Sequence, residues 1–89
     1  MLRYTTTTRF ERDLNLQYKQ GKEIAKLYDV MKQLIAEQPL EKKYRNHKLR
    51  GSYQGHWECH IEPDWLLIYY KTSTEITFVR TGSHSHLLE

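Results

Sequence analysis

Cysteine, proline and glycine are scarce in this chain of 89 residues, which contains one, two and four of them respectively. The single cysteine, Cys59, has no second thiol for an internal disulfide, so the fold does not depend on oxidation and a reducing cytoplasm is the expected location. No apolar run approaches the roughly 20 residues of a membrane-spanning helix, and no basic start followed by an apolar run marks a secretion signal. We therefore expect a soluble protein without a membrane partner.

The length predicts a single domain over residues 1–89, because domains commonly contain about 100 to 150 residues. Apolar residues make up 38% of the chain, and seven tyrosines and two tryptophans add large side chains that bury area while keeping a polar group available. This content is sufficient for one modest core.

The net charge of +3 is unevenly distributed along the chain. Residues 42–50, with the sequence KKYRNHKLR, contain five basic side chains and no acid, namely Lys42, Lys43, Arg45, Lys48 and Arg50. Tyr44 and His47 are interleaved with them. Such a segment is typical of a surface that binds a polyanion, and equally of a solvated loop between a helix and a sheet.

The first half of the chain predicts a strand followed by two helices. Residues 1–7 have a β-prone composition, and Thr8 with Glu11 matches the capping box that opens a helix. Phe10, Leu14 and Tyr18 form one apolar stripe, and Gly21 is typical of a helix end. A second apolar period of 3.6 residues then predicts a helix that Pro39 terminates; its apolar positions are Ile24, Leu27, Tyr28, Met31, Leu34 and Ile35.

The second half changes to a period of two and predicts three strands. Residues 56–62 alternate, with Trp57, Cys59 and Ile61 toward the core and the histidines on the polar face. Residues 65–70 are apolar on both faces, which is typical of a central strand. Residues 75–82 place Ile76, Phe78 and Arg80 on one side.

The expected fold class is therefore α+β. An N-terminal strand and a two-helix hairpin precede a three-stranded antiparallel meander, and the strands form one sheet with the helices on one face. The other face is left free for a site that collects the polar side of residues 56–62, the turn at residues 62–64 and the end of the last strand.

Acid–base chemistry is one interpretation of the polar residues in this half. Cleavage of RNA at its own 2′-hydroxyl requires a group that takes a proton, a group that gives one to the leaving oxygen, and cations near the phosphate. Histidine, aspartate and arginine meet these needs, and the candidates are His47, His60, His84, Asp64 and Arg80. The alternative is that these histidines are ordinary surface residues, and composition alone favours it.

The aromatic residues and the cysteine also have two interpretations each. Trp65 packs at the sheet edge or stacks on a base, and the same choice is open for Tyr44 and Tyr53. His56, Cys59 and His60 resemble metal ligands, but strand alternation turns Cys59 away from the histidines, so no zinc or other metal site is expected.

Two motifs resemble the YafQ branch of the RelE family of bacterial toxins. They are a histidine before an L-x-G turn followed by H-x-E-P-D-W, within HKLRGSYQGHWECHIEPDW, and a closing R-T-G-[ST]-H, here RTGSH. They cover roughly the C-terminal half, while the N-terminal helices agree only in length and pattern. The resemblance implies a RelE-like fold and a metal-independent, ribosome-dependent mRNA interferase that cuts message in the A site, uses no cofactor and is neutralised by an antitoxin of the DinJ or RelB type.

Matched position by position, the resemblance implies an active site made of His47, His60, Asp64, Trp65, Arg80 and His84. It departs from the family near the end, where Leu87 or Leu88 stands in place of an aromatic residue. The working assignment takes Asp64 with His60 as the base side and His84 as the acid, and the reverse order is also open. Arg80 and His47 would stabilise the transition state, and Trp65 with the five basic residues of residues 42–50 would bind RNA.

Two other functions fit the same sequence. ParE-like toxins share the fold class and inhibit DNA gyrase by binding, without chemistry of their own. A basic RNA-binding domain without catalysis is the third reading, and its binding would depend on salt because phosphate contacts do. The collected acid–base groups favour the interferase. The free toxin is expected to be a monomer.

Overall fold

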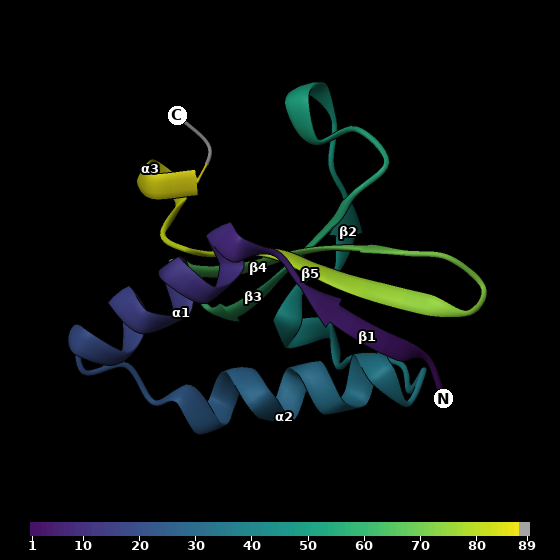
Figure 1. Ribbon diagram of the computed structural model, residues 1–89, viewed down its shortest axis with the longest axis horizontal. Coiled ribbons are helices and arrows are strands. Elements are labelled where there is room, and N and C mark those ends of the chain that lie inside the picture. The colour runs from purple at the N-terminus through teal and green to yellow at the C-terminus, as the bar shows by residue number, and fades with distance from the viewer. Residues whose placement is uncertain (88–89) are drawn as a thin grey trace.

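The computed structural model describes residues 1–87, and within this part of the chain five strands form one mixed sheet in the order β1-β5-β4-β3-β2 (Figure 1). The strands are β1 (Arg3–Thr6), β2 (His47–Lys48), β3 (Trp57–Glu62), β4 (Trp65–Lys71) and β5 (Glu75–Gly82). Strand β1 pairs in parallel with β5, and the remaining neighbours are antiparallel. Leu88 lies outside the described residues.

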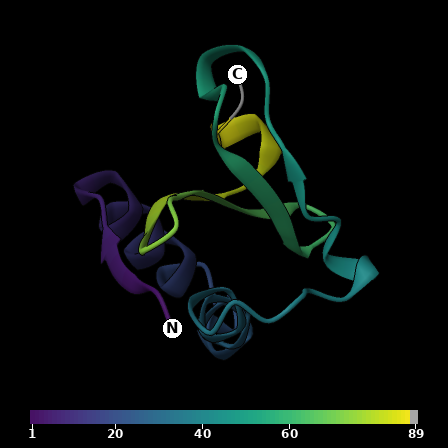
Figure 2. The same cartoon turned by 90° about the vertical axis from the view of Figure 1, so that its right-hand side faces the viewer.

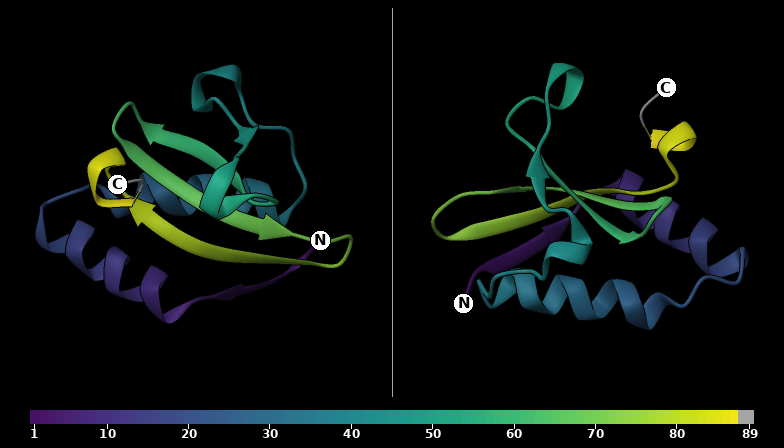
Figure 3. Two further views of the ribbon diagram at one scale, coloured as in Figure 1. Left: turned by 90° about the horizontal axis from the view of Figure 1, so that it is seen from above. Right: turned by 180° about the vertical axis from the view of Figure 1, so that it is seen from behind.

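Helices α1 (Thr8–Lys19) and α2 (Ile24–Ile35) lie on one side of the sheet (Figures 1 and 2). The opposite side carries the short helix α3 (His84–Leu87) and the 3-10 turn η2 (Gly51–Tyr53), which rise from the sheet in the right view of Figure 3. A second 3-10 turn, η1 (Lys42–Tyr44), connects α2 to β2. None of the helices within residues 1–87 is long and apolar enough to cross a membrane. The α+β arrangement expected from the sequence is confirmed.

Strand β4 is the centre of two apolar clusters, as its continuous hydrophobic sequence predicts. Trp65, Leu67 and Tyr69 pack with the helices in the main core. Leu66 and Ile68 point to the other face, where Leu87 covers them. Both faces of β4 are covered by side chains. The neighbouring strands β3 and β5 therefore also present one set of side chains to each side of the sheet.

The ends of both helices differ in detail from the expected signals. The hydroxyl of Thr7, not Thr8, caps α1 by accepting the Phe10 N–H at 3.0 Å, so the pairing expected between Thr8 and Glu11 is wrong by one residue. Gly21 does end α1, in the left-handed region at φ 81°. Helix α2 ends with the same geometry before Pro39 is reached, because Glu37 adopts φ 58°.

The buried face of α1 also differs from the expected apolar stripe. Phe10 is buried and Leu14 packs against the core, but Tyr18 is 71% exposed. Asp13 and Gln17 are buried in its place, so a carboxylate points inward from this helix. Since a buried charge requires a partner, this carboxylate predicts a cation nearby.

A β-bulge changes the orientation of the last strand. Phe78 pairs with Tyr69 and Arg80 pairs with Ile68, so Val79 is an extra residue between two consecutive pairs. Phe78 therefore faces the helices with Tyr69, whereas Arg80 shares the opposite face with Ile68. The expectation that Arg80 lies on the same side as Ile76 and Phe78 is wrong, because strict alternation does not anticipate a bulge.

Trp65 lies fully buried in the main core, where its indole N–H donates to the Thr81 hydroxyl at 3.0 Å. We predict that Trp65→Phe lowers the free energy of unfolding by about 1–3 kcal/mol, since it removes this hydrogen bond and leaves part of the cavity empty. Urea denaturation measures the change, with Tyr18→Phe as an exposed aromatic control that stays within about 0.5 kcal/mol of the wild type. An unchanged midpoint for Trp65→Phe would contradict the burial of this residue.

Candidate active site

Three histidines from distant parts of the sequence form a row on the sheet face opposite the helices. His47 lies in β2, His60 in β3 and His84 opens α3. The ring centroids of His47 and His60 are 6.2 Å apart, and those of His60 and His84 are 5.5 Å apart. The antiparallel pairing of β2 with β3 creates the first of these contacts, because His47 is the direct partner of Glu58.

Glu58 is the residue of this row that the sequence reasoning missed. Its carboxylate is 4% exposed, and its Oε2 lies 3.1 Å from Nε2 of His47. Its Oε1 lies 3.9 Å from Nε2 of His60 and has no hydrogen-bond partner among residues 1–87. A signal was present, because Glu58 occupies the polar face of the same strand as His60.

Backbone carbonyls fix the tautomers of two rings. Nδ1 of His47 donates to the Arg45 carbonyl at 2.6 Å, and Nδ1 of His60 donates to the Pro63 carbonyl at 3.2 Å. The Nε2 atoms of both rings therefore face Glu58. The contact between Nε2 of His47 and Oε2 of Glu58 is an ion pair when the ring is protonated. In a neutral ring of His60 with its proton on Nδ1, Nε2 carries the free lone pair.

Asp64 hydrogen-bonds His84, whereas the working assignment grouped it with His60 on the base side. Its Oδ1 accepts the backbone N–H of His84 at 3.0 Å and the ring Nδ1–H at 2.7 Å. These bonds, the backbone one first, lower the pKa of the Asp64 carboxyl. Asp64 therefore fixes the ring of His84, whose Nε2 points away from this contact.

Arg80 is held by the inward-pointing carboxylate of α1. Its Nε lies 2.6 Å from Oδ2 of Asp13 and its Nη2 lies 3.1 Å from Oδ1, and both side chains are buried. The bond to Asp13 raises the pKa of Arg80, and Tyr53 acts in the same direction. Nη1 is outside this bidentate pair. Asp13 was absent from the sequence-based candidates because helical periodicity placed it beside the expected apolar stripe.

Asp13 has two further partners near Arg80. It accepts the backbone N–H of Thr81 at 3.1 Å and lies 3.3 Å from Nε2 of His86. The carboxylate thus satisfies a free donor at the edge of β5, where β1 no longer pairs. One side chain fixes both the strand edge and the arginine.

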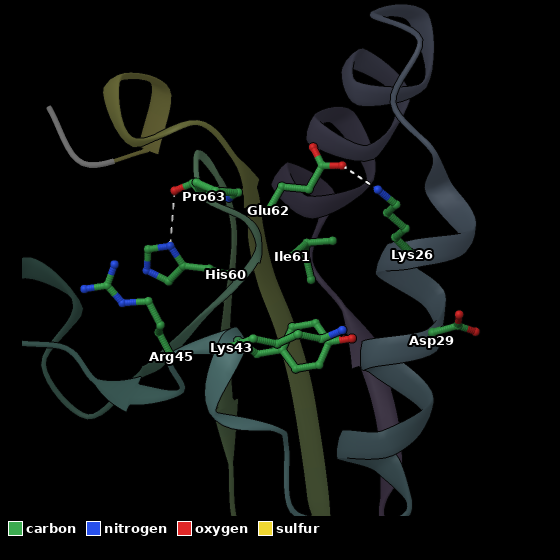
Figure 4. A pocket seen from close by; sticks show the side chains of 9 residues that line it. Lys26, Asp29, Lys43, Arg45, His60, Ile61, Glu62 and Pro63 are labelled. Atoms are coloured by element: carbon green, nitrogen blue, oxygen red, sulfur yellow. Dashed lines mark hydrogen bonds and ion pairs between the residues drawn. The ribbon is translucent and has the colours of Figure 1, made fainter.

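The basic segment of residues 42–50 divides into groups that point in different directions. Lys43 and Arg45 line a hollow of about 480 Å³ together with His60 (Figure 4). Lys48 turns to the other face, where its ammonium lies 5.5 Å from the ring of Trp57. Arg50 lines a separate hollow, and Lys42 is exposed in η1. Only part of the segment is therefore near the histidine row.

Trp65 has no exposed surface with which to contact RNA, so its expected role in RNA binding is corrected to core packing. It faces the helices and not the histidine row, because β4 alternates. Tyr44 lines the hollow beside His60 and Tyr53 lies on the face of the histidines, so both remain accessible to a ligand.

His56, Cys59 and His60 resemble metal ligands in the sequence, but a different group of residues has the geometry of a metal site in the structure. Ligand atoms of His47, Glu58 and His60 all lie within 4.8 Å of one another. Cys59 points into the core, and burial raises the pKa of its thiol to about 12, so it stays protonated. A divalent cation held by the three residues would occupy the nitrogen atoms available for proton transfer.

Comparison with known proteins gives one family. The sequence model of the family described as bacterial toxin of type II toxin-antitoxin system, YafQ, matches residues 2–89. The mRNA interferase toxin YafQ of Escherichia coli (strain K12) is 40% identical over 79 residues, which cover 88% of this chain and 86% of that protein.

Solved structures agree with this match. A chain in the crystal structure of the E. coli DinJ–YafQ complex superposes with a TM-score of 0.94 at 36% identity, with 100% of both chains covered. The metal-bound toxin from Helicobacter pylori gives a TM-score of 0.92 at 40% identity, covering 99% of this chain and 100% of that one.

The contact between Asp64 and His84 predicts a measurable titration. Because His84→Ala removes the ring donor but keeps the backbone N–H, the pKa of Asp64 should rise part of the way toward its ordinary value of about 3.9. The carboxyl carbon shift, followed by NMR against pH, reports this change. Glu62, whose pKa is lowered by the hydrogen bond from Lys26, is the control and should not move.

The same pairing sets the sign of a stability change with pH. A carboxyl whose pKa is lowered in the folded state stabilises the fold above its unfolded pKa of about 4 and loses this effect as the pH falls through the lowered folded value. An Asp64 titration identical in the wild type and His84→Ala would show that the ring contact has no electrostatic consequence.

Proposed function

This chain belongs to the YafQ family of toxins from bacterial type II toxin–antitoxin systems and is an mRNA interferase, and we propose that it cuts message in the ribosomal A site by metal-independent attack of the RNA 2′-hydroxyl. The observation that supports this mechanism best is the row of His47, His60 and His84 with Arg80 beside it on one sheet face. The row supplies a proton acceptor, a proton donor and cations within one site.

His60 is the proposed general base. Its Nδ1 is occupied by the Pro63 carbonyl, so its Nε2 accepts the proton of the 2′-hydroxyl. The unpartnered Oε1 of Glu58 lies 3.9 Å away and stabilises the imidazolium that forms. As the 2′-oxygen bonds to phosphorus, the bond to the 5′-oxygen breaks, and a 2′,3′-cyclic phosphate remains.

His84 is the proposed general acid. Asp64 accepts its Nδ1–H, which fixes the ring and leaves Nε2 to face the leaving 5′-oxygen. This division modifies the assignment made from the sequence, because Asp64 acts through His84 and not as part of the base. Asp64 is therefore a positioning residue.

Arg80 and His47 are proposed to stabilise the negative charge on phosphorus. The pair with Asp13 orients the guanidinium, and its Nη1 and remaining positive charge face the phosphate. His47, whose Nε2 lies 3.1 Å from Oε2 of Glu58, is the second proposed contact to the phosphate. Lys43 and Arg45 would bind the RNA backbone beside His60.

An antitoxin of the DinJ type is the proposed partner of this toxin in the cell, as in the E. coli DinJ–YafQ complex. We propose that the toxin acts in the cytoplasm on translating ribosomes and is a monomer when free. The gyrase-inhibiting alternative is less well supported, because binding to a protein target does not require histidines that are each fixed by a backbone carbonyl or a carboxylate.

Cleavage of a defined message in a reconstituted translation system tests the reaction. We expect the wild type to cut only when ribosomes are present and His84→Ala to be about 10²–10⁴-fold slower, the usual effect of losing a general acid. Lys32→Ala, an exposed residue of α2 on the helical side of the sheet, is the control and should cut at the wild-type rate. Wild-type cutting by a folded His84→Ala would remove this residue from the mechanism.

Metal independence has its own test. We expect 1,10-phenanthroline, which binds transition metals and leaves the Mg²⁺ of the ribosome in place, to have no effect on the cleavage rate of toxin pre-treated with it. Added Zn²⁺ should slow cleavage, because it would bind His47, Glu58 and His60 and block the base. Loss of cleavage with the chelator, restored by zinc, would contradict the proposed base.

A further inference from the structure

Three aromatic rings form a patch at the end of the histidine face that is distant from α3. Tyr53 comes from the η2 turn, His56 directly precedes β3, and Tyr70 lies near the end of β4. The ring centroids of Tyr53 and His56 are 5.7 Å apart, and those of His56 and Tyr70 are 5.4 Å apart. We call these three residues the aromatic patch.

The strand pairing places the aromatic patch on the same surface as the proposed base. Glu58 pairs with Ile68, and Trp57 pairs with Tyr69. Because side chains alternate along each strand, His56 and Tyr70 point to the same face of the sheet as Glu58 and His60. His56 is four residues from His60 along the strand, a distance of about 13 Å. A nucleotide stacked on His56 and Tyr70 is therefore not the one whose 2′-hydroxyl faces His60.

The rings of the patch do not cover one another. His56 and Tyr70 are tilted by 53°, and Tyr53 meets His56 edge-on at 76°. On the other face of the sheet, Trp57 and Tyr69 are stacked nearly parallel at 12°. Tyr70 is 45% exposed, so part of its ring is open to solvent. Exposed aromatic faces of this kind are what single-stranded nucleic acid uses for base stacking.

Positive charge adjoins the patch. A hollow of about 690 Å³ is lined by Lys48, Leu49, Arg50, Gln54 and Gly55. The N–H of Leu49 in this hollow donates to the carbonyl of His56 at 2.9 Å, so the hollow and the patch share a backbone contact. Lys48 directs its ammonium to the other face, so Arg50 is the cation of this hollow that adjoins the rings. A cation beside aromatic rings matches the alternating phosphates and bases of a single strand.

We propose that Tyr53, His56 and Tyr70 form a stacking surface for bases of the message outside the cleavage site, with Arg50 binding an adjacent phosphate. The inference rests on the proposed function, since it assigns a further contact to the same RNA. It gives the distal part of the basic segment, which lies apart from the histidine row, a role in holding the strand.

Binding of single-stranded RNA tests this surface without cleavage. We would use a fluorescent ten-nucleotide RNA with 2′-O-methyl groups, which cannot be cut, and measure anisotropy with the full-length toxin. Tyr70→Ala should weaken binding by about fivefold to a hundredfold, the range expected for loss of one stacked base. Tyr70→Leu should lose as much because it keeps apolar bulk but no aromatic face, whereas Tyr70→Phe should stay within about twofold.

Two controls separate stacking from other effects. Tyr28→Ala removes a tyrosine of equal exposure, 46%, from the helical side and should not change binding. An abasic oligomer with the same number of phosphates should bind Tyr70→Ala and the wild type equally, because it offers charge without bases.

Wild-type binding by Tyr70→Ala, an equal loss in Tyr28→Ala, or an equal loss with the abasic oligomer would each overturn the stacking surface. Absence of RNA binding by the wild type would overturn it as well. The cleavage assay with ribosomes is independent of these results, so cutting by a toxin that fails them would leave the interferase function intact.

Discussion

The bidentate pair between Asp13 and Arg80 is the interaction on which both the fold and the site depend. It joins α1 to β5 where β1 no longer pairs, and the same carboxylate satisfies the free N–H of Thr81. Removing either partner would leave a buried charge uncompensated, which typically costs about 3–5 kcal/mol. Arg80 is therefore placed beside the histidine row by a structural constraint, and its orientation does not depend on RNA.

The bulge at Val79 makes this pair possible. Without the extra residue, alternation along β5 would direct Arg80 toward the helices with Phe78, into the main apolar core. With it, Phe78 packs inside, Val79 covers the second cluster and Arg80 reaches the histidine face. The inserted residue lets the first half of β5 bury its apolar side chains while the second half directs Arg80 to the opposite face. β-Bulges are frequent beside active sites because they re-aim a side chain in this way.

Sequence periodicity predicted the order of the helices and strands, because apolar residues with periods of 3.6 and 2 report burial directly. It also placed the histidines on the polar face of residues 56–62. It could not predict the bulge at Val79, which depends on the register between β4 and β5. Nor could it predict the inward carboxylate of Asp13 or the contact of Asp64 with His84, since these depend on residues 20 or more positions apart meeting in space. Glu58 was visible on the polar face, but only the pairing of β2 with β3 shows that it lies between two histidines.

Each cationic group of the site has its own carboxylate, and each carboxylate comes from a different element. Glu58 of β3 faces His47, Asp64 of the β3–β4 turn holds His84, and Asp13 of α1 holds Arg80. With the carboxylates in place, the rings keep fixed directions before substrate arrives, and little reorganisation is needed when negative charge develops on phosphorus. A surface that only binds a partner would gain nothing from this arrangement, so the pairing itself argues for catalysis.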